Sequence, residues 1–403
     1  MKRFLPRKKK KPTDLNIPQN EYYENISARL GIVQVVLYLS LFAFVVLSFF
    51  RNTQLITYQN FYYFIKDLNA SSESVFAFES DAVTYPTDSE QSFTLYRKGL
   101  AVAGNSSVTI FTATGRQTVS QNISYRNPVA VGTGKYLLVY ELGGLQYSLY
   151  NSYAQVFVGS SEYPILGAAV SNSGMYAIVS SSENYTSTVS LYSSNFSLLN
   201  RYNKVGYVMD VSINQKGTQV AILSSTPQGG EFFTELMLCE PGKSKADTKE
   251  TIEESLGWRC SFTSDGNIAV LHEKGILYLS DDGEELSSYS FAGKTPAAVD
   301  ISEDGVSLCL TSDGAFEEKK IIVFDKNGKM LYNGSVTARV QQIARSGNSL
   351  YWFSDKGIHR LNLKNQESSS LEYDVSKKKL LAPSETEVLI CSPQKAEYIT
   401  FNS

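Results

Sequence analysis

The sequence predicts an all-β fold, a seven- or eight-bladed β-propeller, preceded by one N-terminal transmembrane helix. Two observations predict it. Residues 30–50 form an apolar run without a charge, and from residue 74 onward short strands rich in β-branched and aromatic residues recur about every forty residues. The composition agrees, because 42% hydrophobic residues with 26 Tyr and 21 Phe is typical of a β-rich globular protein rather than a disordered one.

The apolar run extends from Leu30 to Phe50 and reads LGIVQVVLYLSLFAFVVLSFF. As a helix, its 21 residues are long enough to cross a hydrocarbon core of about 30 Å. A helix that is apolar on every side and flanked by Arg29 and Arg51 is better explained by lipid contact than by burial in a protein core. Because no A-x-A-like cleavage site follows, we expect an uncleaved membrane anchor.

Residues 1–29 are predicted to be a basic cytoplasmic tail. Basic residues outnumber acidic ones there by eight to three, and positive charge marks the cytoplasmic side of a membrane helix. The topology-setting basic residues are Lys2, Arg3, Arg7, Lys8, Lys9, Lys10, Lys11 and Arg29. The RKKKK cluster could be a nuclear signal, but beside a membrane helix it is more simply a topology determinant. We therefore expect a single-pass cell-membrane protein whose C-terminal part is extracytoplasmic.

Residues 51–72 are predicted to be a juxtamembrane stalk. The segment TQLITYQNFYYFIKDL, residues 53–68, carries apolar and aromatic side chains at roughly helical spacing. Aromatic residues of this kind favour the membrane interface. We expect a short helix that docks on the domain above it.

Residues 73–403 are predicted to be the extracytoplasmic propeller. Each repeat has a small-residue turn with a glycine and then an apolar strand, as in SNSGMYAIVS and SEDGVSLCL. The predicted blade-turn glycines, which would supply a positive φ, are Gly99, Gly134, Gly174, Gly217, Gly266, Gly305 and Gly347. Their separations of 35, 40, 43, 49, 39 and 42 residues fit a four-stranded blade. A pair of β-sandwiches would lack this long period.

The number of blades depends on the C-terminal region and on how the ring closes. The segment APSETEVLICS, residues 382–392, keeps the repeat's strand without its glycine and suggests an eighth copy. Since a blade can bury its faces only against neighbours, the ring must close, and we expect strands at residues 74–83 and 396–401 to share one blade. Seven and eight blades both remain open from the sequence.

Charge excludes one class of partner. Of 37 Lys/Arg residues nine lie before residue 52, and of 40 Asp/Glu residues three do, which leaves 28 basic and 37 acidic residues for the larger part. No basic cluster interleaved with aromatic residues is visible there, so nucleic acid is not an expected partner.

No catalytic, cofactor-binding or metal-binding residue is predicted. The only histidines, His272 and His359, lie 87 residues apart beside separate strands. The nucleophile elbow, the P-loop and the dinucleotide-binding glycine motif are missing. The acidic turn from Asp281 to Glu285 lacks the alternating spacing of a calcium loop, and Trp258 and Trp352 are interpreted as packing residues.

The cysteines have no metal-ligand spacing. Cys309 and Cys391 lie in apolar strands and are predicted to be buried, while Cys239 and Cys260 form the one pair considered as a disulfide. Glycosylation sequons occur at Asn69, Asn105, Asn122, Asn184, Asn195 and Asn333. In a chain so rich in Ser, Thr and Asn, they indicate nothing about the host.

The order of basic tail, anchor, NFYYFIKDL stalk and blades such as VMDVSINQKGTQVAIL, AVDISEDGVSLCL and IIVFDKNGKMLYNG resembles an uncharacterised family of membrane-anchored propeller-like proteins from Clostridia and related Firmicutes. The resemblance covers nearly the whole chain. It implies a bacterial cell-surface location and an unassigned function, and it transfers no functional residue.

These observations favour a membrane-tethered, non-catalytic scaffold or sensor that presents a propeller rim to an envelope or membrane protein. The alternative is a ligand-binding or hydrolytic propeller with a carboxylate-lined central channel, since the fold hosts both classes. Unpaired charges at the channel mouth would favour the alternative. A broad apolar patch on one rim would favour the scaffold.

Overall fold

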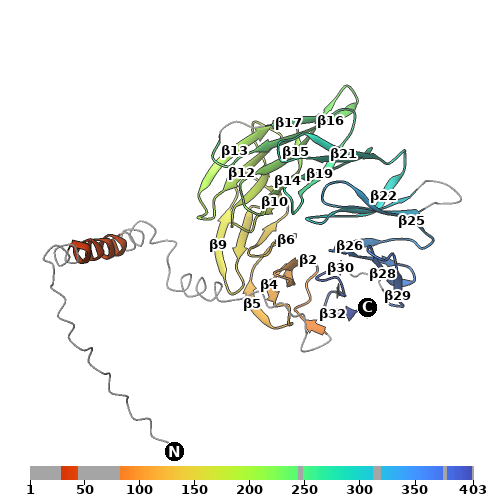
Figure 1. The fold of residues 1–403 in the computed structure, drawn as a ribbon, viewed down its shortest axis with the longest axis horizontal. Helices are drawn as coiled ribbons and strands as arrows, with labels where there is room; N and C mark the ends of the chain where they lie inside the picture. Colours follow the sequence, from red (N-terminus) through yellow and green to blue (C-terminus); the bar gives the residue numbers. More distant parts are fainter. Residues whose placement is uncertain (1–28, 44–81, 244–247, 312–318, 375–378, 402–403) are drawn as a thin grey trace, which may run out of the picture. The chain divides into compact units, whose positions relative to one another are not determined.

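The computed structural model describes residues 29–43, 82–243, 248–311, 319–374 and 379–401. The chain divides into two compact units, Met1–Tyr62 and Tyr63–Ser403. In the first unit, the described residues 29–43 form one helix. In the second unit, the described residues form eight four-stranded antiparallel sheets, which are arranged in a ring (Figure 1).

The first four blades follow one another along the chain. Blade 1 contains β2 (Gln91–Tyr96), β3 (Gly99–Gly104), β4 (Ser107–Phe111) and β5 (Gln117–Asn122). Blade 2 contains β6 (Pro128–Gly132), β7 (Leu137–Glu141), β8 (Gln146–Tyr150) and β9 (Gln155–Ser160). Blade 3 contains β10 (Ile165–Val170), β11 (Tyr176–Ser181), β12 (Ser187–Tyr192) and β13 (Leu198–Lys204). Blade 4 contains β14 (Tyr207–Ile213), β15 (Val220–Gln228), β16 (Glu231–Cys239) and β17 (Thr248–Ile252).

The next three blades repeat the pattern. Blade 5 contains β18 (Gly257–Phe262), β19 (Ile268–His272), β20 (Gly275–Leu279) and β21 (Glu285–Ser290). Blade 6 contains β22 (Thr295–Ser302), β23 (Gly305–Thr311), β24 (Lys319–Phe324) and β25 (Met330–Val336). Blade 7 contains β26 (Gln342–Ser346), β27 (Ser349–Ser354), β28 (Gly357–Asn362) and β29 (Ser368–Leu371).

The eighth blade joins the two ends of the propeller. It combines β30 (Lys379–Leu381), β31 (Glu387–Cys391) and β32 (Lys395–Thr400) with β1 (Ala82–Thr84), which pairs antiparallel with β32. The first strands of blades 1 to 8 contact one another in sequence, and β30 contacts β2. The ring is therefore closed with eight blades rather than seven, and the alternative of two sandwiches is wrong. Of the N-terminal strand expected at residues 74–83, β1 contains the last two, and residues 74–81 lie outside the described residues.

The core lies between the blades. Buried apolar side chains of the described residues form eight clusters, and each cluster joins two neighbouring blades. Both faces of a blade are covered, so the middle strands are mostly apolar: β3, with the sequence GLAVAG, is buried at every residue. The outermost strand β5, QTVSQN, is mostly exposed. Since burial of one large aliphatic side chain contributes about 1.5–3 kcal/mol, closing the ring stabilises every blade.

The blade-turn glycines fall into two groups. Five of them have φ between +55° and +115°: Gly174, Gly217, Gly266, Gly305 and Gly347. Gly99 and Gly134 do not have a positive φ. In blade 1, Arg97 and Lys98 take the left-handed conformation instead, and Gly99 is needed for space, because a Cβ there would lie 2.1 Å from the carbonyl oxygen of Phe111.

The helix over residues 29–43 exposes its apolar side chains, with Leu30 at 63% and Phe42 at 67%. Within the part of the chain that the structure describes, no helix has both the length and the apolar character needed to cross a membrane. The predicted span continues to Phe50, but residues 44–50 lie outside the described residues. The basic residues 2–11 and the predicted stalk 51–72 lie outside them as well.

Candidate functional site

The first strands of the blades enclose a central cavity of about 1610 Å³. Its lining is mixed, with apolar side chains such as Leu166 and Met209 and charged ones such as Asp210 and Arg259. A carboxylate-lined channel is the feature that the enzyme hypothesis requires, and the inner strands carry two aspartates.

Asp210 on β14 and Asp300 on β22 bind the backbone of the following blade. Asp210 Oδ2 accepts a hydrogen bond of 3.0 Å from the Cys260 amide, and Asp300 Oδ2 accepts one of 3.0 Å from the Arg345 amide. Burial raises the pKa of both carboxyls to about 6, although these hydrogen bonds oppose the shift. Each aspartate thus joins two neighbouring inner strands.

Other inner-strand side chains make the same kind of link. Amides of the next blade donate to Ser92 Oγ at 3.1 Å, to Ser212 Oγ at 3.3 Å and to Gln342 Oε1 at 3.0 Å. Hydrogen bonds to buried acceptors contribute about 1 kcal/mol each, and more when the acceptor is charged. Asp210 and Asp300 therefore have a structural explanation as links between blades. The same holds for Asp304, which lines the cavity and accepts a hydrogen bond of 2.8 Å from the Gly347 amide.

Arg259 on β18 is one of the basic residues that line the cavity. Its side chain is exposed, and its positive charge lowers the pKa of both Asp210 and Asp300 against the larger effect of burial. Arg259 is an exposed residue of the cavity lining, and an anionic group is what a guanidinium would bind.

A second feature lies on one rim of the ring. We call it the BC rim: the end at which the second strand of each blade turns into the third and each blade connects to the next. Exposed apolar side chains gather there over blades 2, 3 and 4. This apolar rim sector consists of Leu142, Leu145, Leu166, Tyr185, Val205, Tyr207, Met209 and Phe232. Val205 is 76% exposed and Tyr207 56%, values that are unusual for apolar residues clustered on a monomer.

Backbone hydrogen bonds hold the segments of this sector side by side. The blade 2 turn is joined to blade 3 through the amide of Gly143, which donates to the Ile165 carbonyl at 2.8 Å, and through the amide of Ile165, which donates to the Gly144 carbonyl at 2.8 Å. The blade 3 turn is joined to the following connection, because the Thr186 amide donates to the Lys204 carbonyl at 3.1 Å. The exposed side chains thus sit on one connected and rigid framework.

β-Bulges carry the sector into the mouth of the channel. The pairing of β10 with β11 shifts register between Ile165 and Gly167, and that of β14 with β15 shifts between Val208 and Asp210. The residues at these shifts, Leu166 and Met209, are 45% and 38% exposed and line the cavity. A bulge re-aims side chains at a sheet edge, which explains apolar side chains that face solvent here.

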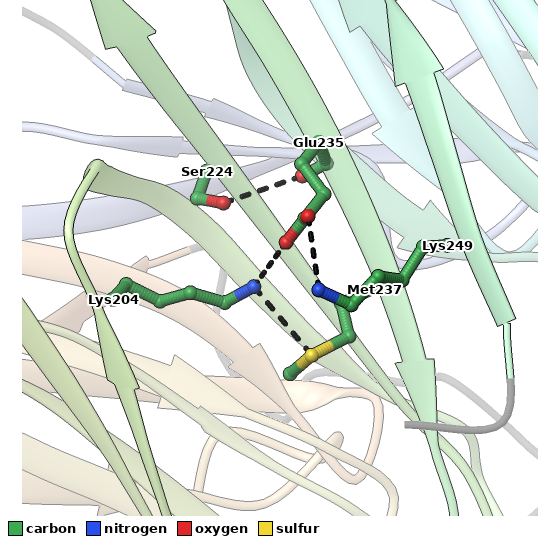
Figure 2. Close-up of polar contacts among 5 residues, drawn as sticks. All are labelled: Lys204, Ser224, Glu235, Met237 and Lys249. Carbon is green, nitrogen blue, oxygen red and sulfur yellow. Dashed lines mark hydrogen bonds and ion pairs between the residues drawn. The ribbon is translucent and has the colours of Figure 1, made fainter. Parts of the chain in front are cut away.

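A buried lysine anchors the connection that carries Val205 and Tyr207. Figure 2 shows Lys204, at the end of β13, pointing at Glu235 on β16 of the next blade, where it forms an ion pair. Lys249 reaches the other carboxylate oxygen at 3.1 Å, and the Lys204 ammonium lies 3.5 Å from the sulfur of Met237. Burial raises the pKa of Glu235, but the two lysines outweigh it and hold that pKa below its usual value.

The residues weighed as catalytic or metal sites are placed apart. His272 shares a 2.8 Å hydrogen bond with Ser255 Oγ, and His359 shares one of 2.6 Å with Ser354 Oγ. Burial lowers the pKa of both imidazoles. The turn from Asp281 to Glu285 is a hairpin tip between β20 and β21, mostly exposed to solvent. Across the described ranges, no group of three His, Cys, Asp or Glu side chains could hold a metal ion.

The cysteines and tryptophans contribute to packing. All four cysteines are buried free thiols. Cys239 lies between blades 3 and 4 and Cys260 between blades 4 and 5, so the considered disulfide is not formed. Trp352 packs between blades 6 and 7 and stacks on His359, with the two ring centroids 5.1 Å apart. Trp258 packs against the cluster between blades 5 and 6.

The sequons differ in accessibility. Asn122, Asn184, Asn195 and Asn333 are exposed. The side chain of Asn105 is occupied, because its amide donates to the Tyr125 carbonyl at 2.9 Å and its oxygen accepts from Ser89 at 2.8 Å. Asn69 lies outside the described residues.

Sequence reasoning identified no residue of the apolar rim sector. A signal was available in ELGGLQ, residues 141–146, and in VGYVM, residues 205–209, where apolar residues occupy turns that are normally polar. Their exposure depends on the register shifts, which cannot be predicted from the repeat.

Comparisons with known proteins agree with the fold. The model of a family of unknown function, DUF5711, matches residues 77–401. No curated protein matches significantly. Solved structures of the same fold include Sqt1 from Saccharomyces cerevisiae, with a TM-score of 0.56 and 10% identity over 82% of this chain and 100% of that chain.

Two further solved structures are similar. Chaetomium thermophilum Sqt1, bound to the N-terminus of the ribosomal protein L10, has a TM-score of 0.53 and 11% identity over 80% of this chain and 100% of that chain. BamB from Moraxella catarrhalis has a TM-score of 0.51 and 10% identity over 81% of this chain and 100% of that chain. At such low identity, these likenesses show the fold alone.

Proposed function

The chain belongs to the DUF5711 family of unknown function, and we propose that it is a membrane-tethered extracytoplasmic scaffold or sensor that binds a protein partner through the apolar rim sector. The observation that carries this proposal is the set of eight exposed apolar side chains on one rim. Large exposed apolar patches with polar surroundings mark interaction sites on soluble domains.

The tether rests on the N-terminal segment. The helix over residues 29–43 exposes apolar side chains on all sides, and the sequence remains apolar to Phe50. Basic residues precede it, and because positive charge marks the cytoplasmic side of a membrane helix, they support a cytoplasmic tail at residues 1–29 and a propeller on the other side. We propose that residues 30–50 are the anchor, that residues 51–72 are a stalk and that residues 73–403 are the extracytoplasmic part, at the surface of a Firmicute cell.

Rigidity supports the scaffold. Eight apolar clusters and the inner-strand hydrogen bonds hold every blade against its neighbours, so the rim segments are preorganised and lose little conformational freedom when a partner binds. Sqt1, of the same fold, has been solved bound to a protein N-terminus. Nothing in this proposal requires catalysis.

A ligand-binding channel is the second candidate, and Arg259 is the observation that favours it. Its exposed guanidinium lies in a cavity of about 1610 Å³. Calorimetric titration of the full-length protein with small carboxylates and phosphates, with Arg259→Ala as the comparison, tests it. Binding that the substitution abolishes supports the candidate, and the absence of heat for every anion rejects it.

Proximity labelling in the native membrane tests the scaffold. The full-length protein is compared with a version that lacks residues 69–403 and keeps the anchor. We expect envelope or membrane proteins to be enriched only when the propeller is present. Equal recovery with both versions would reject the proposal.

A further inference from the structure

Charge is distributed unevenly around the BC rim. The second-to-third-strand turns of blades 2 to 5 on this rim, together with the connections that join these four blades to one another, are residues 141–146, 160–165, 181–187, 204–207, 228–231, 252–257 and 272–275. They contain seven glutamates: Glu141, Glu162, Glu183, Glu231, Glu253, Glu254 and Glu273. They contain two basic residues, Lys204 and Lys274.

The two basic residues do not offset the negative charge. Lys204 is 8% exposed and its charge is directed inward to Glu235. Lys274 lies 3.6 Å from Glu254 and neutralises that one carboxylate. Arg201 on β13 forms an ion pair of 3.8 Å with Glu162. The remaining glutamates leave a net negative charge beside the apolar rim sector.

Three of the glutamates are open to a partner. Glu231, Glu253 and Glu273 are exposed, and none makes an ion pair with a residue that the structure describes. They lie on blades 4 and 5 beside Phe232: the Ser255 amide, in the connection that carries Glu253, donates to the Phe232 carbonyl at 2.9 Å. Apolar contacts and uncompensated carboxylates are thus offered on the same surface.

We infer that this rim binds a basic amphipathic segment of a partner protein, in which apolar side chains pack on the apolar rim sector and Lys or Arg side chains meet the glutamates. The inference rests on the proposed function and specifies its partner. Complementary charge guides association and excludes wrong partners. An anionic lipid surface is disfavoured, because it attracts basic segments and would repel this rim.

Site-specific photo-crosslinking in the native membrane tests the partner's chemistry. A benzophenone amino acid replaces Tyr207 in the full-length chain, and the crosslinked peptides are identified by mass spectrometry. We expect peptides of another protein that combine apolar residues with a net positive charge. The same reagent at Leu286, an exposed residue of the outer strand β21, reports background.

Charge reversal gives the matched control. The triple variant Glu231→Lys, Glu253→Lys, Glu273→Lys should lower the crosslinking yield about tenfold at low salt, with a smaller loss at high salt. The triple variant Asp281→Lys, Glu284→Lys, Glu285→Lys changes net charge equally on the opposite rim of blade 5 and should leave the yield unchanged. Equal losses in both variants would contradict the inference.

The identity of the crosslinked peptides separates the two proposals. Acidic or uncharged peptides from another protein would overturn the inferred chemistry and leave the scaffold intact. Peptides from a second copy of this chain would also overturn the inference. If lipid alone is crosslinked, or no protein at all, both the inference and the proposed function fail.

Discussion

A buried ammonium group is tolerated at Lys204 because Glu235 sits opposite it and a second lysine, Lys249, shares that carboxylate. The pair is asymmetric. Lys204 has a side-chain exposure of 10%, whereas Glu235 has 35%. Loss of the carboxylate would leave a buried charge unpaired, whereas loss of the lysine leaves Glu235 with Lys249 and water.

This asymmetry gives a prediction for stability. Glu235→Gln should lower the free energy of unfolding by about 3 kcal/mol, because it leaves Lys204 without its counter-ion. Lys204→Met should cost about 1 kcal/mol or less, since it replaces the ammonium by an apolar group of similar length. Urea unfolding of the full-length protein in detergent measures both. A larger loss for Lys204→Met would contradict the explanation.

The inner-strand aspartates Asp210 and Asp300 give a prediction for pH dependence. Their folded pKa of about 6 exceeds the unfolded value of about 3.9. The folded state thus binds these protons more tightly, and their contribution to stability falls as pH rises from about 4 to about 6. In the double variant Asp210→Asn, Asp300→Asn, the free energy of unfolding should no longer contain this contribution to its pH dependence.

The measurement is the difference in free energy of unfolding between this variant and the wild type at pH 4.5 and 7.5. We expect the variant to be more stable relative to the wild type at pH 7.5 than at pH 4.5. Asp281→Asn, in the exposed hairpin tip, controls for the substitution itself. A shift in the opposite direction would mean that the aspartates stabilise the ring as carboxylates.

Among the elements, the three-residue strand β1 closes the ring of blades. It supplies the fourth strand of blade 8, and Val83 is buried in the cluster between blades 8 and 1. The ring closes through this pairing, which joins segments more than 300 residues apart in the chain. A closed ring has no exposed seam, so damage at this strand should affect all of it.

Val83→Asp tests the closing strand. An unpaired carboxylate in the blade 8/1 cluster should lower the free energy of unfolding by about 3 kcal/mol or more and lower Tm. The control is Val158→Asp, on the outer strand β9, where the side chain is 59% exposed and the cost should be about 0.5 kcal/mol. Similar losses in the two variants would show that β1 does not close the ring.

The repeat in the sequence was sufficient for the fold class, because each blade restarts the same turn and apolar strand. The shared eighth blade was also expected from the C-terminal segment AEYITF. Two details could not be predicted from the sequence. The turn of blade 1 depends on Arg97 and Lys98 rather than Gly99, and the bulges at Leu166 and Met209 depend on strand pairing, which a local pattern does not specify.

At the scale of the whole molecule, one rim of a rigid ring carries both exposed apolar side chains and a net negative charge. The sequence alone led to expectations of a scaffold or of a carboxylate-lined channel. The structure separates these features: Asp210 and Asp300 bind backbone amides, while exposed apolar side chains lie on the rim. The clustering of these apolar side chains could not be predicted, since it brings together turns of blades 2, 3 and 4 that are distant in the sequence.

The measurement that tests the central claim most directly is crosslinking of rim variants to protein partners in the native membrane. The variant Leu145→Ser, Val205→Ser, Tyr207→Ser removes apolar side chains from the rim sector. The control Leu286→Ser, Met330→Ser, Leu371→Ser removes exposed apolar side chains from outer strands of blades 5, 6 and 7. We predict that partner recovery falls at least about tenfold for the rim variant and is unchanged for the control. Unchanged recovery with the rim variant would contradict the account.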